Sequence, residues 1–142
     1  WFGPAGARVL TGISWTVAQT PVASGSGSNG IFALAFHDGQ DGLAVGGDFL
    51  APAASPNNFA RTSDSGRTWQ LEPGGPPEYR SGVMWVDGHT VIAVGPTGSD
   101  VSTDFGLTWQ RFDNGSFDTV DCASPVACWA SGELGRVAYL DH

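Results

Sequence analysis

An eight-residue pattern occurs twice in this chain, with forty residues between equivalent positions. Thr62-Ser63-Asp64-Ser65-Gly66-Arg67-Thr68-Trp69 is matched by Ser102-Thr103-Asp104-Phe105-Gly106-Leu107-Thr108-Trp109. We call these segments box 1 and box 2. A fixed period of this length is the signature of an architecture that stacks one supersecondary unit many times. The repeat therefore limits the possible folds more strongly than composition does.

The residues around each box complete a unit of four short apolar strands. In the first complete unit, 30–72, strands are expected at 31–36, 42–47, 59–62 and 68–71. In the second, 80–113, they are expected at 82–86, 91–95, 100–103 and 108–112. Four short strands per repeat of about forty residues is typical of a propeller blade. The 21 glycines, 9 prolines and only 14% charged residues also favour a turn-rich all-β chain.

Partial units flank the two complete ones. Residues 117–142 repeat the first three strands and stop where a box would follow, whereas residues 1–19 resemble the last strands of a unit. In that N-terminal copy, Gly12-Ile13-Ser14-Trp15 matches the end of a box, but Leu10 occupies the aspartate position. The prediction is a single all-β domain over 1–142: a β-propeller arc of four-stranded antiparallel blades, two complete and one partial at each end.

An arc of this size leaves the closure of the ring open, because closed propellers have at least four blades. The chain could be a segment of a longer propeller with about six to eight blades. Alternatively, two copies could close a six-bladed ring as a homodimer, each donating its N-terminal strands to the other's final sheet. The chain starts with Trp1 rather than Met, so the sequence does not show its true N-terminus.

Two segments do not repeat. Residues 20–30 have the Gly- and Ser-rich composition of a flexible linker between blades. Residues 50–58 form an expanded loop between the second and third strands of the first complete unit. Loops of this kind carry function where a repeat protein has any, although simple variation in loop length is the alternative.

The box residues are expected to be structural. Asp64 and Asp104 can accept hydrogen bonds from the backbone N–H groups of their own turns. A catalytic or metal-binding role is the alternative, but the two carboxylates lie one whole repeat apart and hence on separate blades. The other positions are assigned to the same turns: Thr62 and Ser102 open them, Gly66 and Gly106 allow the tight backbone, Thr68 and Thr108 begin the outer strand, and Trp69 and Trp109 are apolar plugs.

Cys122 and Cys128 flank a Ser-Pro turn between two expected strands. Across such a hairpin the two Cα atoms can fall within the range of about 4.4–6.8 Å that a disulfide needs. The prediction is a disulfide, with two reduced buried cysteines as the alternative. Because disulfides persist outside the cytosol, the pair points to an extracytoplasmic protein, periplasmic or secreted.

Charge and motifs exclude several functions. The net charge of −8 and the six Lys and Arg residues oppose binding to nucleic acid or to an anionic membrane surface. No apolar run approaches the roughly 18–20 residues that span a bilayer. His37, His89 and His142 are scattered, and no known catalytic, phosphate-binding or dinucleotide-binding motif occurs. We therefore predict no catalytic residue, no cofactor and no metal site.

The pattern [Ser/Thr]-x-Asp-x-Gly-x-Thr-Trp resembles the Asp-box, or BNR repeat, of sialidases, other glycoside hydrolases, sortilin-type receptors and Ycf48-type photosystem II assembly factors. The order of aromatic-x-Asp (36–38), Gly-Leu-Ala-Val-Gly (42–46) and box is most similar to the last group and its bacterial relatives. The Cys-x5-Cys-Trp-Ala-x-Gly stretch (122–132) also resembles repeats of exported bacterial propellers. The resemblance is specific for architecture and much less so for function.

This resemblance implies a non-enzymatic scaffold that binds a protein or glycan partner. One alternative is a fragment of a sialidase-like or other glycoside hydrolase, and another is an isolated propeller segment with no function of its own. Glu78, Tyr79 and Arg80 are the only local cluster suited to a ligand, since they precede an inner strand near one rim of the ring. Their alternative role is a polar connector between blades.

Overall fold

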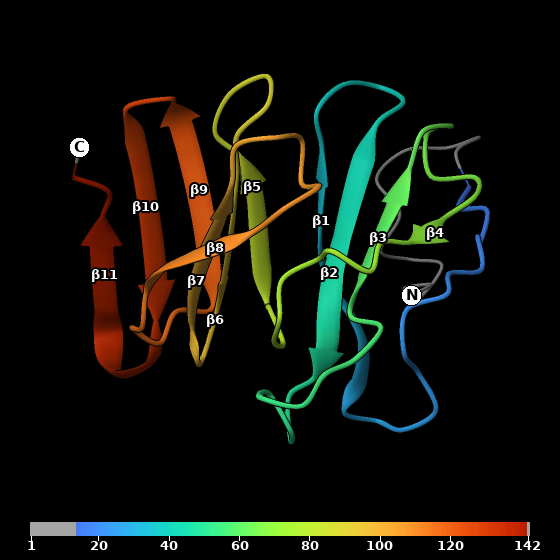
Figure 1. Ribbon diagram of the computed structural model, residues 1–142, viewed down its shortest axis with the longest axis horizontal. Helices are drawn as coiled ribbons and strands as arrows, with labels where there is room; N and C mark the ends of the chain where they lie inside the picture. The colour runs from blue at the N-terminus through green and yellow to red at the C-terminus, as the bar shows by residue number, and fades with distance from the viewer. Residues whose placement is uncertain (1–13, 142) are drawn as a thin grey trace.

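The computed structural model describes residues 14–141 and contains three antiparallel sheets that stand face to face (Figure 1). The first blade is β1 (Asn29–Phe36), β2 (Gly42–Asp48), β3 (Phe59–Thr62) and β4 (Gln70–Leu71). The second blade is β5 (Gly82–Trp85), β6 (Val91–Gly95), β7 (Gly98–Ser102) and β8 (Gln110–Asp113). The third sheet is β9 (Thr119–Ser124), β10 (Ala127–Gly132) and β11 (Arg136–Tyr139), with a 3₁₀ turn, η2 (Glu133–Gly135), before its last strand.

The fold class is therefore an all-β propeller arc, as predicted. In each sheet neighbouring strands are consecutive in the chain, which is the up-and-down order of a propeller blade. The N-terminal partial blade was predicted over 1–19, and residues 1–13 lie outside the described part of the chain. Residues 14–28 contain no strand. Among residues 14–141 there is no helix of the length and apolarity that crossing a membrane requires.

The outer strands begin two residues later than predicted. β4 starts at Gln70 and β8 at Gln110, rather than at Thr68 and Thr108. The reason is local, because each threonine is held in its turn by the preceding aspartate, as described below. A box thus ends in a turn, and its last residue leads into a short strand.

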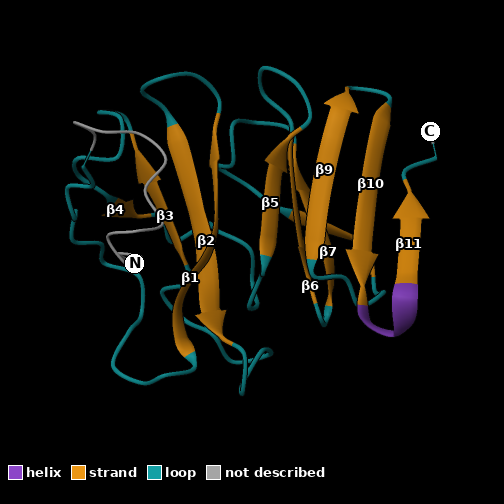
Figure 2. Cartoon of the chain, turned by 180° about the vertical axis from the view of Figure 1, so that it is seen from behind, coloured by secondary structure: helices purple, strands orange, loops and turns teal. Residues whose placement is uncertain are grey.

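The alternating strand directions sort the connections onto two opposite ends of the sheets (Figure 1). One end, which we call the loop rim, carries the β2–β3 loop, the β4–β5 connector, the β6–β7 turn and η2. The other end, the box rim, carries the first hairpin turn of each sheet and both boxes. Seen from behind in Figure 2, the same arrangement holds, with β4 and β11 at opposite ends of the arc.

Apolar side chains pack together in both spaces between neighbouring sheets. Between the first and second blades, Leu43, Val45 and Phe59 pack against Val83 and Val91, and all five are buried. Such close burial of branched and aromatic side chains is the main source of stability in a domain of this size.

The space between the second blade and the third sheet has a smaller core. It contains the buried residues Ile92, Val94 and Phe117, with half-buried side chains such as Ala130 and Ala138 at its margin. Alternate residues of β6 therefore serve the two interfaces, as the two-residue period of a strand buried on both faces requires.

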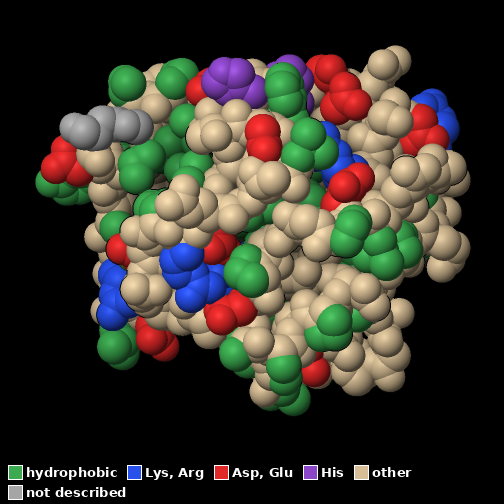
Figure 3. All heavy atoms as spheres, in the orientation of Figure 1, with side chains coloured by type: hydrophobic (Ala, Val, Ile, Leu, Met, Phe, Trp, Pro, Cys, Tyr) green, Lys and Arg blue, Asp and Glu red, His purple; other side chains and the backbone are tan. Residues whose placement is uncertain are grey.

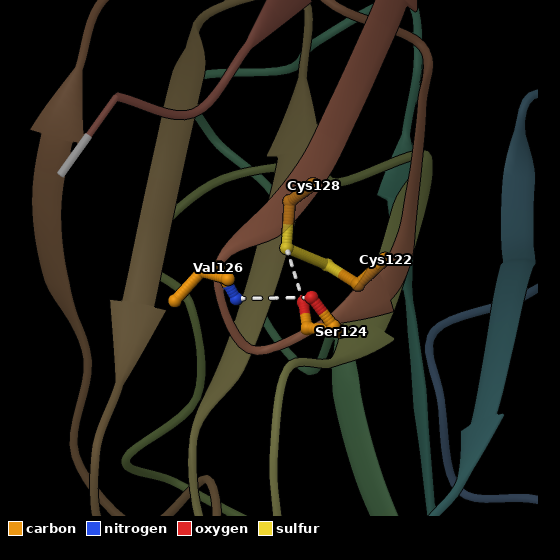
Figure 4. Close-up of a disulfide and its surroundings, with 4 residues drawn as sticks. All are labelled: Cys122, Ser124, Val126 and Cys128. Carbon is orange, nitrogen blue, oxygen red and sulfur yellow. Dashed lines mark hydrogen bonds between the residues drawn. A yellow bond between two sulfur atoms is a disulfide. The ribbon is translucent and has the colours of Figure 1, made fainter.

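The predicted disulfide between Cys122 and Cys128 is present and fastens the hairpin of β9 and β10 (Figure 4). The two residues are direct cross-strand partners, and their Cα atoms are 4.1 Å apart, slightly closer than the expected range. Val126 N–H donates to Ser124 Oγ in the turn below. The pairs at the equivalent register of the other two blades are Phe36–Gly42 and Trp85–Val91.

Candidate functional site

The expanded β2–β3 loop and the β4–β5 connector enclose a groove of about 560 Å³ on the loop rim. One wall is residues 53–58 and the other is residues 71–77. Pro56, Pro73 and Pro77 are exposed along it, so much of the lining is rigid and apolar. Glu72 is the only charged side chain among the lining residues. We call this hollow the loop-rim groove.

Buried polar side chains fix both walls of the groove. Asn58 is buried, and its Nδ2 donates to the carbonyl oxygens of Pro76, at 3.0 Å, and Glu78, at 2.6 Å. On the loop side, the Ser55 hydroxyl donates to the carbonyl of Ala51 at 3.1 Å and accepts the N–H of Asp48 at 3.0 Å. These bonds satisfy backbone groups that the loop would otherwise bury unpaired, so the groove is formed before any ligand arrives.

Asn57 gives the loop its sharp bend. Its φ of 55° lies in the left-handed region, which asparagine tolerates better than most residues. The Asn57 carbonyl accepts the N–H of Ala23 at 2.8 Å, and Val22 beside it is buried. The segment before β1 is thereby attached to the expanded loop and supports one end of the groove.

An aromatic cluster lies on the same rim. Phe32 of β1 makes edge-to-face contacts with Phe49, at a centroid distance of 5.9 Å, and with Tyr79, at 5.1 Å. Tyr79 is buried, whereas Phe32 and Phe49 are each more than 40% exposed. Burial, the largest cause, raises the pKa of the Tyr79 hydroxyl. The cluster extends the apolar surface of the rim beyond the groove.

A buried ion-pair network lies behind the connector. Arg80 is fully buried, and its Nε donates to Asp100 Oδ2 at 2.7 Å. Its Nη2 approaches the same oxygen at 2.6 Å, although outside hydrogen-bond geometry. The remaining guanidinium nitrogen, Nη1, donates to the carbonyl of Tyr79 at 2.7 Å and to the Thr97 hydroxyl at 3.1 Å.

Arg111 of β8 joins this network at its solvent side. Its Nη2 donates to Glu78 Oε2 at 2.9 Å, and its Nε donates to Asp100 Oδ1 at 3.4 Å. The Thr97 hydroxyl also donates to Glu78. Hydrogen bonding from Thr97 is the largest cause that lowers the pKa of Glu78, with further lowering by Arg111 and Arg80. Burial lowers the pKa of Arg80, and Asp100 partly offsets that effect.

These contacts locate the three residues singled out as ligand candidates. Arg80 has no exposed side-chain surface, and Tyr79 is buried against Phe32. Only the Glu78 side chain reaches solvent, at 22% exposure. The backbone N–H groups of Tyr79 and Arg80 donate to Pro52 and Gly46 of the first blade, so this segment also connects the blades. Its ionic partners, Asp100 of β7 and Arg111 of β8, are distant in the chain, and no local sequence pattern predicts their contact with it.

The two boxes have matching hydrogen bonds on the box rim. In box 1, Asp64 Oδ1 accepts the Thr68 N–H at 2.8 Å and Oδ2 accepts the Thr68 hydroxyl at 2.6 Å. In box 2, the corresponding distances from Thr108 to Asp104 are 2.9 and 2.6 Å. These bonds lower the pKa of each aspartate from 3.8 to about 2, and the bond from the threonine hydroxyl is the largest cause.

The remaining box positions complete the turns. Gly66 and Gly106 both have φ of 81°, which a side chain would resist, and each donates its N–H to the hydroxyl that opens its box, Thr62 or Ser102. The indole N–H of each tryptophan donates to the carbonyl of that glycine at 3.0 Å. Trp109 packs edge-to-face on Phe59 of the first blade, whereas Trp69 contacts Phe36 of its own blade.

Histidine side chains gather along the upper edge in Figure 3, over the β1–β2 and β5–β6 turns. His37 contacts the Trp85 ring at 5.0 Å, and His89 contacts the Phe105 ring at 6.1 Å. Each histidine lies beside an aspartate of its own turn. Among residues 14–141, no group of three or more His, Cys, Asp or Glu side chains could hold a metal ion.

Comparisons with known proteins show what this architecture is similar to. No family model matches the chain, and no curated protein matches it. The structure of YCF48 bound to D1 peptide superposes with a TM-score of 0.63 at 18% identity, over 78% of this chain and 37% of that one. The crystal structure of an ancestral GH74 enzyme superposes with a TM-score of 0.55 at 16% identity, over 79% of this chain and 17% of that one.

At these identities the likeness shows a shared fold, which is a partial β-propeller. The chain spans about a third of the length of YCF48 and about a sixth of the length of the GH74 enzyme.

Proposed function

We propose that this propeller arc is a non-enzymatic scaffold that binds an extended peptide segment of a partner protein in the loop-rim groove. The observation that carries the proposal is the groove itself, whose proline-rich walls are fixed by the buried Asn58 and Ser55. A site that is ordered in advance loses little conformational entropy on binding. Its rigid apolar walls suit the side chains of an extended peptide, and the exposed Asn57 offers an amide for its backbone.

The negative charge of the groove and of the whole chain limits which partner segments can bind. Glu72 is the one charged residue that lines the groove, Glu78 lies six residues further along the connector, and the whole chain carries −8. We infer that the bound segment carries basic as well as apolar side chains, because complementary charge speeds association and selects partners. Glu78 lies at the margin of the site with its carboxylate bonded to Arg111 and Thr97, and Arg80 and Tyr79 fix the connector from behind.

Two further observations support this class of function. YCF48, which has the same fold, has been solved with a bound peptide, the D1 peptide. The Cys122–Cys128 disulfide is compatible with an extracytoplasmic location, where we place the protein. We further propose that both boxes are repeats of the Asp-box (BNR) type, with structural rather than catalytic aspartates, since each carboxylate is bonded within its own turn.

The test is a peptide selection on the immobilised 142-residue chain, followed by affinity measurements. We expect selected peptides to combine apolar and basic residues. Ala54→Trp places a large side chain in the groove from the loop wall and should weaken their binding by about tenfold or more, which is about 1.4 kcal/mol. Ala51→Trp is the matched control, because Ala51 is exposed in the same loop but does not line the groove.

Two results would contradict the proposal. One is a selection that enriches no peptide, or peptides whose affinity Ala54→Trp leaves unchanged. The other is turnover of a fluorogenic sialoside or another glycoside, which would favour the glycoside hydrolase alternative suggested by the GH74 likeness. Glu72→Gln tests the charge argument separately, since it should weaken basic peptides and leave neutral ones unaffected.

A further inference from the structure

A second hollow, of about 170 Å³, lies on the first blade beside the loop-rim groove. Its charged lining residues are Asp41, Arg61 and Glu72, and the neutral ones, among them Ser63 and Gln70, are all polar. Glu72 lines the loop-rim groove as well, so the two hollows are neighbours. The lining belongs to a complete four-stranded blade. We call this feature the charged hollow.

Arg61 is held in place by the second blade. Its Nη1 donates to the carbonyl of Phe105 in box 2. Among residues 14–141, that is the one hydrogen bond of the guanidinium, and neither Asp41 nor Glu72 forms an ion pair with it. The carboxylates of Asp41 and Glu72 likewise bond to no other side chain in the described part of the chain. Charges of both signs therefore line one hollow with unused hydrogen-bonding capacity.

Strand register sets the order of these charges. Leu43 of β2 pairs with Arg61 of β3, which pairs with Gln70 of β4. Asp41 comes two residues before Leu43, and Glu72 two residues after Gln70, where its N–H continues the ladder to β3. Residues two apart along a strand share a face. The charges therefore run negative, positive, negative from the box rim towards the loop rim, each step being about 6.8 Å along the strands and about 4.8 Å across them.

This order of charges selects a particular kind of ligand. Two carboxylates repel a simple anion, and Arg61 repels a lone cation. The complement is a ligand whose charges run positive, negative, positive. An extended protein segment presents every second side chain on one face at a spacing of about 6.8 Å, which is close to the spacing of the charges in the hollow. Flexible basic side chains can cover the remaining difference.

We propose that the charged hollow binds a part of the partner segment with the pattern basic-x-acidic-x-basic. The acidic side chain pairs with Arg61, and the two basic side chains pair with Asp41 and Glu72. Because the pattern is the same in both chain directions, the hollow accepts a segment of either polarity. The role given to Arg61 rests on the peptide-binding function proposed above, since the same segment enters the loop-rim groove at Glu72.

Isothermal titration of the 142-residue chain with extended peptides tests the proposal. A peptide selected on the loop-rim groove is lengthened at either end by Lys-Ser-Glu-Ser-Lys. The matched control carries Glu-Ser-Lys-Ser-Lys, which has the same composition and net charge in another order. We expect the first extension, at its better end, to bind about fivefold more tightly than the control at low salt. The difference should shrink as salt is added, because exposed charges are screened.

Two variants of Arg61 test which residue reads the acidic position. Arg61→Gln keeps an amide that can donate to the Phe105 carbonyl, and it should bind both extensions equally. Arg61→Glu should instead prefer Lys-Ser-Lys-Ser-Lys. Arg67→Gln is the matched control, because Arg67 is exposed in box 1 but does not line the hollow. A purely structural role of Arg61 would weaken all peptides together, and thermal melting curves establish that each variant is folded.

Two results would overturn the role of the charged hollow alone. One is equal binding of the ordered and reordered extensions to the wild type. The other is a folded Arg61→Gln variant that keeps the wild-type preference. In both cases the loop-rim proposal stands if Ala54→Trp still weakens the unextended peptides. A selection that enriches no peptide overturns both proposals.

Discussion

The second blade packs against both of its neighbours, but the two interfaces are built differently. On the first-blade side, Trp109 covers Phe59, and the Arg80 ion pair lies behind the connector. On the third-sheet side, Phe117 packs with Ile92 and Val94, and a hollow remains open. The comparison shows what a box adds to an inter-blade space, namely an outer plug over the inner core that the strands supply.

The same comparison explains the buried charges. Arg80 donates its N–H to Gly46, and Phe117 donates its N–H to Gly95, so the two residues occupy equivalent positions. Asp100 pairs with Ala93 as Ala138 pairs with Ala130, so these two are also equivalent. One blade therefore holds an ion pair where the third sheet holds a phenylalanine and an alanine. The fold therefore accepts either an ion pair or two apolar side chains at this position.

The largest effect is expected from breaking that ion pair. Asp100→Ala leaves the fully buried Arg80 without its main partner, and an uncompensated buried charge costs roughly 3–5 kcal/mol of the free energy of unfolding. Urea denaturation followed by tryptophan fluorescence measures this loss. A change below about 1 kcal/mol would show that Glu78, which lies 3.8 Å from Arg80, and water replace the ion pair.

The double variant Arg80→Phe/Asp100→Ala sharpens the comparison, because it copies the third sheet into the second blade. It should recover at least half of the stability that Asp100→Ala loses, since apolar side chains of suitable volume often replace a buried ion pair without cost. A double variant less stable than Asp100→Ala would contradict the equivalence of the two positions.

The box tryptophans give the next largest effect. Trp109→Ala removes the plug between the first and second blades and should cost about 3 kcal/mol. Trp69→Ala should cost less than half as much, since Trp69 contacts Phe36 of its own blade, whereas Trp109 packs against the core between two blades. Thermal unfolding of the two variants side by side makes the measurement. Equal losses would show that the plugs act within their own turns alone.

The disulfide is expected to have a smaller effect. Replacing Cys122 and Cys128 with serine opens a short loop with a sequence separation of six, which costs about 2 kcal/mol on the chain-entropy account. Urea denaturation with and without reductant measures it. The reductant should lower the stability of the wild type to the level of the serine variant and leave that variant unchanged.

The smallest effect on stability is expected from lowering the pH. The pKa values of Asp64 and Asp104 are near 2 in the folded chain and 3.8 ordinarily, so the unfolded chain binds more protons between these values. Their stabilisation is complete above about pH 4 and is lost as the pH falls towards 2. The variant Asp64→Asn/Asp104→Asn should be less stable at neutral pH, melting a few degrees lower, and should show a shallower loss of stability in acid. Parallel curves for the variant and the wild type would contradict this assignment.

Much of the fold could be predicted from the sequence, because the box repeats and the strands between them alternate in a regular way. The strands of both blades lie within about two residues of the predicted ranges. The start of β4 could not be predicted, since Thr68 has strong strand propensity but is held in the turn by Asp64. The hydrogen bonds from Thr68 to Asp64 outweigh the strand propensity of threonine at this position.

Less of the candidate site could be predicted. Residues 50–58 stood out as an expanded loop, and Glu78 to Arg80 as a polar cluster, because both interrupt the repeat. The second wall of the groove did not stand out, since it depends on Asn58 reaching Pro76 across 18 positions of sequence. Likewise, nothing local to Arg80 indicates that Asp100 neutralises it. Sites assembled from long-range contacts leave little trace in a single local pattern.

The cross-strand position beside each first hairpin turn holds a different chemistry in every sheet. It is a phenylalanine over a glycine in β1–β2, a tryptophan beside a valine in β5–β6, and a disulfide in β9–β10. The backbone frame thus accepts interchangeable fasteners, one of which is reversible by a reducing agent. A protein engineer who copies the second blade to lengthen the arc could choose at each copy between a permanent apolar fastener and one released on demand.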